Sequence, residues 1–119
     1  MTGFSTNLDT PPSAMVICAH PDDAEFQCGA TLAKWAAHGC VVHYLVCTDG
    51  SKGTWDVEAD IVALVALRRV EQAEAATRLG ATGQVAFLGV TDGELQSDLT
   101  TRSAVTEWIR RLEPAVLLG

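Results

Sequence analysis

Short apolar runs alternate with longer amphipathic stretches from residue 14 to the end of the chain. The runs are rich in apolar and β-branched residues and are bounded by turn residues, which is typical of buried strands. In the longer stretches, apolar residues recur at the spacing of a helix with one buried face. The pattern predicts strands over residues 14–19, 41–47, 84–88 and 116–118. It predicts helices over residues 28–38, about 59–79 and 98–113.

Strands and helices that alternate in this way predict an α/β fold with a Rossmann-like, mostly parallel sheet and helices on both faces. Residues 1–13 are polar and contain Pro11-Pro12, so we expect a flexible N-terminal segment there. Residues 14–119 are expected to form the N-terminal part of a single domain. The last predicted strand stops at Gly119, where such a sheet normally continues into a functional loop, so we expect a fold that is incomplete at the C-terminus.

The charge balance is acidic, with 15 Asp and Glu against 8 Lys and Arg. This balance excludes the basic surface that nucleic acids require. No apolar run approaches the roughly 20 residues of a membrane span, and the N-terminus lacks the pattern of a signal peptide, so we expect a cytoplasmic protein. The four cysteines form no C-x-x-C pair and lie in apolar stretches, where we expect buried thiols rather than disulfides.

A first group of polar residues, His20, Asp22 and Asp23, follows the first predicted strand. Ligands of parallel sheets bind beyond the carboxyl ends of the strands. An imidazole and a carboxylate three residues apart can turn towards one point, and both are ordinary zinc ligands. A neighbouring carboxylate could then act as a base. The spacing alone leaves a second interpretation open, because Pro21 and the acidic residues also suit the start of an ordinary helix.

Two further loops follow the second and third predicted strands, at residues 48–56 and 91–95. Their glycines and hydroxyls could let backbone N–H groups approach a ligand, or could serve as plain turns. Neither loop has the spacing of a P-loop or of a dinucleotide-binding motif. On the long helix between them, Arg68 and Glu71 are also spaced for an ordinary surface pair.

Four motifs occur in order along the chain: AHPDDAEFQCGATLA, LVCTDGSKGTW, R-x-x-E from Arg68 to Glu71 with Leu79-Gly80 behind it, and FLGVTDGEL. Together they resemble the PIG-L/LmbE-like de-N-acetylase family over residues 14–118. The resemblance implies a zinc-dependent hydrolase. Such an enzyme removes the acetyl group from an N-acetylglucosamine-type substrate and releases acetate and a free amine.

The resemblance also implies roles for single residues. His20 and Asp23 match the first two zinc ligands of the family, and Asp22 matches its general base. Arg68 and Asp92 match positions that help to bind the sugar. The cofactor implied is Zn²⁺, and the expected partner is a small N-acetylated amino sugar.

The chain departs from the pattern of the family at two positions and ends before a third feature. Ala24 stands where many members have Glu, with Glu25 one step later as in bacterial LmbE-like members. Ala115 replaces an acidic residue that often precedes the fourth strand. The third zinc ligand of the family is a histidine that would lie beyond Gly119. We therefore expect residues 1–119 alone to be an incomplete catalyst.

An alternative from another class is a phospho-receiver-like module of the flavodoxin type. The length and the acidic pair after the first strand suit such a module. A receiver, however, has its accepting Asp after the third strand and its Lys after the fifth, whereas Asp49 and Lys52 here share one loop after the second. The sequence leaves a homo-oligomer open.

Overall fold

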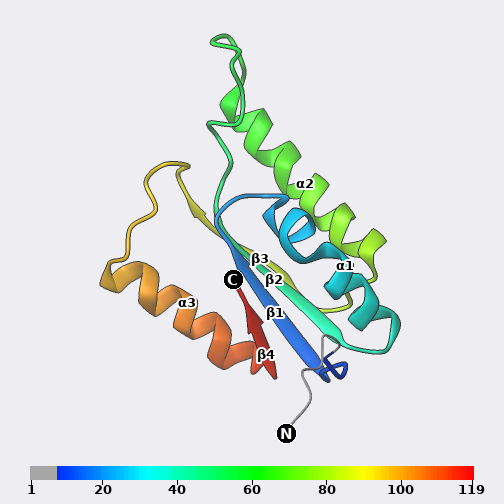
Figure 1. Cartoon of the computed structure of the whole chain (residues 1–119). Helices are drawn as coiled ribbons and strands as arrows, with labels where there is room; N and C mark the ends of the chain where they lie inside the picture. Colours follow the sequence, from blue (N-terminus) through cyan, green and yellow to red (C-terminus); the bar gives the residue numbers. More distant parts are fainter. Residues whose placement is uncertain (1–7) are drawn as a thin grey trace, which may run out of the picture.

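The computed structural model describes residues 8–119, which contain four strands and three helices in the predicted order (Figure 1). The strands are β1 (Ser13–Cys18), β2 (Val41–Thr48), β3 (Val85–Val90) and β4 (Val116–Leu118). The helices are α1 (Asp23–Ala37), α2 (Ile61–Leu79) and α3 (Leu99–Leu112). Every predicted element is confirmed. The expected flexible N-terminal segment lies outside the described residues as far as residue 7.

Helix α1 begins at Asp23, before the apolar stripe at Cys28 and where Pro21 and the acidic residues suit a helix start. Its backbone leaves helical geometry at Cys28, where φ is −144° and ψ is 21°. Despite this kink, the fully buried Ala24 lies in the same core cluster as Leu32 and Trp35. The first turn of α1 also carries polar residues of the candidate site.

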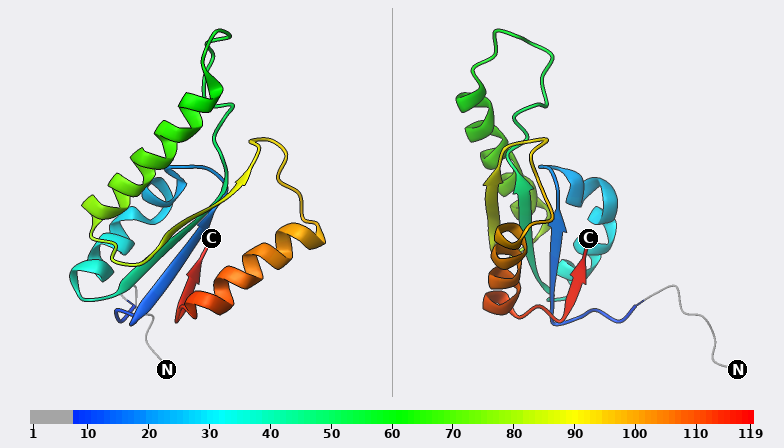
Figure 2. Two further views of the ribbon diagram at one scale, coloured as in Figure 1. Left: turned by 180° about the vertical axis from the view of Figure 1, so that it is seen from behind. Right: turned by 90° about the vertical axis from the view of Figure 1, so that its left-hand side faces the viewer.

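The four described strands form one parallel sheet in the order β3-β2-β1-β4. Helices α1 and α2 cover one face of this sheet and α3 covers the other (Figures 1 and 2). The predicted α/β fold is therefore confirmed. From β1 the chain moves to β2 and β3 on one side, and β4 later joins the other side of β1. In sheets of this kind, the carboxyl ends at such a change of direction are where ligands bind.

The core consists of two clusters, one on each face of the sheet. Successive residues of β1 point to opposite faces, so Val16 belongs to one cluster and Met15 to the other. On the α1–α2 face, Leu32 and Trp35 of α1 pack against β1 and β2. On the α3 face, Met15 packs with partly buried residues of α3. Neither cluster includes residues from the loops at the carboxyl ends of the strands, where polar side chains lie.

Helix α2 has well-defined ends, which matters because it carries site residues. The Asp60 side chain accepts a hydrogen bond from the backbone N–H of Ala63 (3.1 Å) and so caps the first turn. The helix ends at Gly80, whose φ of 101° suits glycine, and the predicted end is confirmed. Within residues 8–119, no helix has the length and apolar character needed to cross a membrane.

Candidate active site

The loops that follow β1, β2 and β3 meet at one edge of the sheet, beside the first half of α2 (Figures 1 and 2). Two backbone hydrogen bonds hold them together. The N–H of Thr48 donates to the carbonyl of Ala19 (2.8 Å), and the N–H of Asp49 donates to the carbonyl of Val90 (2.9 Å). The three sequence-predicted loops therefore form one continuous surface.

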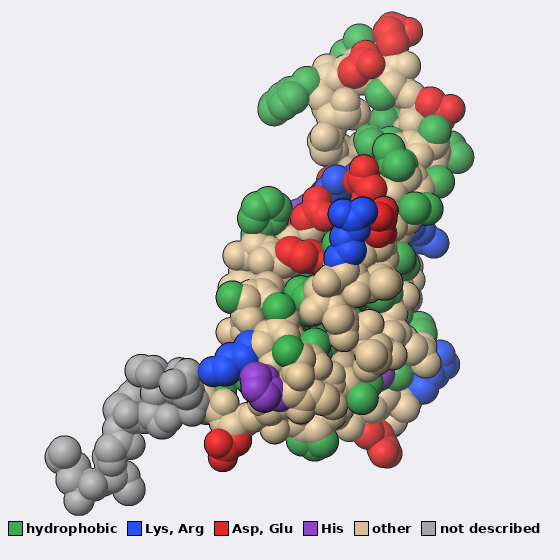
Figure 3. All heavy atoms as spheres, turned by 90° about the vertical axis from the view of Figure 1, so that its right-hand side faces the viewer, with side chains coloured by type: hydrophobic (Ala, Val, Ile, Leu, Met, Phe, Trp, Pro, Cys, Tyr) green, Lys and Arg blue, Asp and Glu red, His purple; other side chains and the backbone are tan. Residues whose placement is uncertain are grey.

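An open cleft of about 460 Å³ lies between these loops and α2. Leu64 and Leu67 of α2 give it an apolar wall. Figure 3 faces the α1 and α2 side of the molecule and shows acidic and basic side chains gathered in one place on that face. The polar side chains that line the cleft are His20, Arg68, Glu71 and Asp92.

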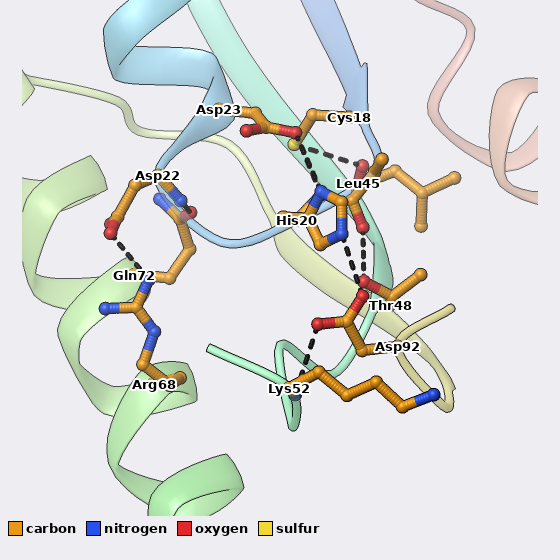
Figure 4. Close-up of polar contacts among 11 residues, drawn as sticks. Cys18, His20, Asp22, Asp23, Leu45, Thr48, Lys52, Arg68, Gln72 and Asp92 are labelled. Carbon is orange, nitrogen blue, oxygen red and sulfur yellow. Dashed lines mark hydrogen bonds and ion pairs between the residues drawn. The ribbon is translucent and has the colours of Figure 1, made fainter. Parts of the chain in front are cut away.

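His20 and Asp23 lie together, as their spacing predicts (Figure 4). Nδ1 of His20 is 3.6 Å from Oδ2 of Asp23, and the backbone N–H of His20 donates to the same oxygen over 3.0 Å. Nε2 of His20 is 2.9 Å from Oδ1 of Asp92. Because an ionised carboxylate only accepts hydrogen bonds, this contact requires Nε2 to carry the proton. In the neutral ring, the lone pair then lies on Nδ1, the nitrogen nearer Asp23.

Two hydrogen bonds to the loop after β2 hold Asp92 in place. Its Oδ2 accepts a hydrogen bond from the backbone N–H of Lys52 (3.2 Å), and its own N–H donates to Oδ1 of Asp49 (3.1 Å). Oδ1 of Asp49 also accepts from the N–H of Ser51 (2.9 Å). Burial disfavours the charged form of Asp49, but these hydrogen bonds outweigh burial and lower its pKa. The Asp49 carboxylate thus joins the two loops and fixes Asp92 against His20.

Asp22 points the other way, towards α2. It occupies the N-cap position of α1 with φ 75° and ψ −15°, a left-handed conformation that few residues with a Cβ adopt. Its carboxylate makes no capping bond to α1 and instead accepts from Nη2 of Arg68 (2.7 Å). Nη1 of Arg68 donates to Glu71 (3.1 Å). The structure therefore pairs Asp22 with Arg68 and separates both from the group around His20 (Figure 4).

Gln72, which no sequence motif singles out, completes the surroundings of Asp22. Its side chain is fully buried. Oε1 accepts from the backbone N–H of Asp22 (2.8 Å), and Nε2 donates to Oε1 of Glu25 (2.6 Å). The available signal was a polar residue on the buried stripe of α2, four residues before the buried Ala76.

Gly50 lets the second loop approach the first. Its φ is 69°, and a Cβ at this position would lie 3.3 Å from Cδ of Pro21. A larger residue would therefore be strained in its backbone and would press on the turn that leads into Asp22.

The His20 and Asp23 donor set fits part of a zinc site. Two protein ligands of a tetrahedral zinc ion, each bonded at roughly 2.1 Å, lie about 3.4 Å apart. Nδ1 of His20 and Oδ2 of Asp23 are 3.6 Å apart, which is close to that separation. Within residues 8–119, the side chains of His, Cys, Asp and Glu form no group of three placed to hold a metal. The nearby Cys18 thiol donates to the carbonyl of Leu45 (3.8 Å).

The fold and the site together define an α/β protein with a pair of metal-type ligands and a neighbouring carboxylate at the end of its first strand. Comparison with known families then makes the assignment specific. The family model described as PIG-L, GlcNAc-PI de-N-acetylase, matches residues 15–118, and the chain belongs to this family. The resemblance seen in the sequence is thereby confirmed.

Two similar proteins are diacetylchitobiose deacetylases. The chain is 34% identical over 105 residues to the enzyme from Thermococcus kodakarensis, an alignment that covers 87% of this chain and 39% of the relative. The solved structure of N,N′-diacetylchitobiose deacetylase from Pyrococcus horikoshii matches with a TM-score of 0.85 and 32% identity. That match covers 90% of this chain and 40% of the other. The chain thus spans about 40% of the length of these relatives.

A third similar protein has a different reaction in its name. The structure of GalB, the 4-carboxy-2-hydroxymuconate hydratase from Pseudomonas putida KT2440, matches with a TM-score of 0.80 and 28% identity. The match covers 90% of this chain and 46% of that one. The fold alone therefore does not select the reaction, which depends on the residues at the site.

Proposed function

We propose that the complete protein is a zinc-dependent deacetylase that hydrolyses the acetamide of an N-acetylglucosamine-type sugar to acetate and a free amine. The observation that carries this proposal is the approach of His20 Nδ1 to Asp23 Oδ2 (3.6 Å) at the cleft, with the Asp22 carboxylate next to them in the chain. The names of two relatives, both diacetylchitobiose deacetylases, support the substrate class.

His20 and Asp23 would hold the zinc ion, which when bound supplies a Lewis acid that lowers the pKa of water and stabilises negative charge on the acetyl oxygen. Asp22 takes a proton from the water as the water oxygen forms a bond to the acetyl carbon. The leaving nitrogen receives a proton, from Asp22 or from a group outside residues 8–119, as the C–N bond breaks. Arg68 keeps the Asp22 carboxylate oriented through its 2.7 Å hydrogen bond.

A catalytic zinc site normally has three protein ligands, so this proposal includes a third ligand beyond Gly119. Sugar binding by Arg68 and Asp92 also remains a proposal. Arg68 has five N–H donors, of which the contacts with Asp22 and Glu71 use two. Each carboxylate oxygen of Asp92 has a second lone pair that a sugar hydroxyl could use.

The test is acetate release by the complete, zinc-loaded protein from N-acetylglucosamine, N,N′-diacetylchitobiose and an N-acetylglucosaminyl inositol. We expect acetate and free amine in equal amounts, loss of both after chelation, and recovery when zinc is added back. Residues 1–119 alone should release neither. An enzyme with full zinc content that leaves all three sugars intact would contradict the proposal.

Two smaller proposals accompany this one. The membership of the PIG-L family favours the deacetylase over the phospho-receiver module considered from the sequence. The four cysteines are free thiols, which supports the cytoplasm as the location because disulfides are rare there. Fractionation of cells that produce the protein from its own gene tests the location.

A further inference from the structure

The backbone at Asp22 departs from two local preferences at once. Its φ of 75° lies in the left-handed region, which disfavours residues with a Cβ. As the N-cap residue it would normally accept a hydrogen bond from the first turn of α1, but its side chain makes no such bond. Because neither preference favours this geometry, contacts from elsewhere in the fold have to hold it.

Helix α2 supplies those contacts. Gln72 accepts the backbone N–H of Asp22 (2.8 Å), and Arg68, one turn earlier on the same face, donates to the Asp22 carboxylate (2.7 Å). Figure 4 shows both side chains reaching Asp22 from this helix. One residue thus holds the main chain of Asp22, and the other holds its reactive group.

Glu25 decides which way the Gln72 amide faces. A carboxamide has a donor end and an acceptor end, and only the acceptor end can receive the N–H of Asp22. Oε1 of Glu25 accepts from Nε2 of Gln72 (2.6 Å), which turns Oε1 of Gln72 towards Asp22. The other oxygen of Glu25 is buried and has no hydrogen-bond partner among residues 8–119. The contact with Gln72 is therefore the hydrogen bond that the Glu25 carboxylate makes among these residues.

We propose that Gln72, oriented by Glu25, is a positioning residue that locks the backbone of Asp22 and so holds its carboxylate on Arg68, which lines the cleft. The consequence for catalysis rests on the proposed deacetylase function, in which Asp22 is the base. The lock itself is a property of the folded chain and is measurable without turnover, from the protection of the Asp22 amide against hydrogen exchange.

The first experiment compares Gln72→Leu with the wild type in the complete, zinc-loaded protein. Leu keeps the bulk of the side chain and removes both hydrogen bonds. We expect the Asp22 amide to lose protection and kcat to fall on the order of 100-fold, because small displacements of a reacting group lower rates steeply. Zinc content should stay unchanged, and KM should change much less than kcat. Gln84→Leu, at an exposed position before β3, is the matched control and should behave as the wild type.

A second experiment covers the case in which Gln72→Leu fails to fold. Gln72→Glu alone sets two carboxylates against each other and should lower both kcat and the protection of the Asp22 amide. Adding Glu25→Gln restores one amide and one carboxylate with their positions exchanged. The amide at position 25 then donates to the carboxylate at position 72, which still accepts from Asp22. We expect the double variant to recover most of both losses.

Two results would overturn the lock. One is a folded Gln72→Leu protein with wild-type kcat and Asp22 protection, and the other is a double variant as impaired as Gln72→Glu alone. If the wild type deacetylates none of the sugars but Asp22 protection falls with Gln72→Glu and returns in the double variant, the lock stands and the proposed function fails.

Discussion

Asp22 and Asp23 have the same side chain and adjacent positions, yet they face different partners. The left-handed backbone at Asp22 directs its carboxylate to Arg68. Asp23 begins α1 with its carboxylate beside the imidazole of His20. At the scale of single residues, backbone geometry rather than residue type therefore separates the proposed base from the proposed ligand.

Asp22→Asn should keep zinc and lose most turnover. Asn tolerates the left-handed conformation and keeps the shape of the side chain, but it accepts no proton from water. Removing a general base typically lowers kcat by about 10²–10⁴-fold. Asp23→Asn is the matched variant and should lose zinc affinity instead. Zinc analysis and acetate release on both proteins check the assignment, and near-normal turnover of Asp22→Asn would refute it.

Asp92→Asn should weaken zinc binding. The Asn amide that replaces Oδ1 would donate to Nε2 of His20, which moves the ring proton to Nδ1 and blocks the proposed ligand atom. Loss of a carboxylate behind a metal-bound histidine typically lowers metal affinity by about 10–100-fold. Competition with a chromogenic chelator measures this affinity. Unchanged zinc affinity would mean that Asp92 does not set the tautomer of His20.

The sequence predicts His20 with Asp23 but not Gln72 with Glu25, and separation along the chain explains the difference. Three residues at the end of a strand determine their own proximity. Gln72 and Glu25 are 47 residues apart, so their contact exists only once α1 and α2 have packed on the same face of the sheet. Nothing in the local pattern around either residue reports that contact.

At the scale of elements, the sequence predicts the end of a helix or strand where its apolar spacing continues up to that end. The end of α2 at Gly80 is such a case. The apolar stripe from Cys28 does not reach the start of α1 at Asp23, but Pro21 and the acidic residues after it suit a helix start there. The pattern predicts an end of β3 at Leu88, but the strand continues to Val90 past a register shift in its pairing with β2 between Val46 and Thr48.

Gly50→Ala should damage the loop after β2. Alanine at this position would have a strained positive φ, and its methyl group would lie 3.3 Å from the Pro21 ring. We therefore expect a loss of about 1 kcal/mol in stability and a higher KM. Gly29→Ala is the control, because its Cβ meets only Glu25 Cβ at 3.8 Å within a helix. It should leave stability equal or raised. Thermal unfolding of both proteins distinguishes the two effects.

At the scale of the whole molecule, the two ends of the sheet are chemically different. The cleft lies at the carboxyl ends of the strands. Near the amino ends, His43 of β2 contacts the segment before β3. Nδ1 of this buried histidine accepts a hydrogen bond from the N–H of Gln84 (2.9 Å). Burial lowers the pKa of His43 below its ordinary value of 6.5.

The lowered pKa of His43 makes the fold sensitive to mild acid. Its contribution to stability is present above pH 6.5 and falls at lower pH, because the unfolded chain then binds a proton more readily than the folded one. His43→Asn keeps an acceptor for Gln84 and removes the titration. Urea unfolding between about pH 7.5 and 5.5 should show a shallower loss of stability in the variant. Equal slopes would contradict the assignment.

The proposed ligands, base and sugar contacts belong to neither hydrophobic cluster. They lie on the loops after β1 and β3, at the start of α1 and on one face of α2, at the carboxyl end of the sheet, and the core that maintains the sheet lies behind them. The residues that maintain the fold are therefore different from the residues proposed to carry out the reaction. Substitutions in the loops can then explore new substrates while the core stays unchanged. The similar structure of a hydratase agrees with this view, because the same architecture there carries a different reaction.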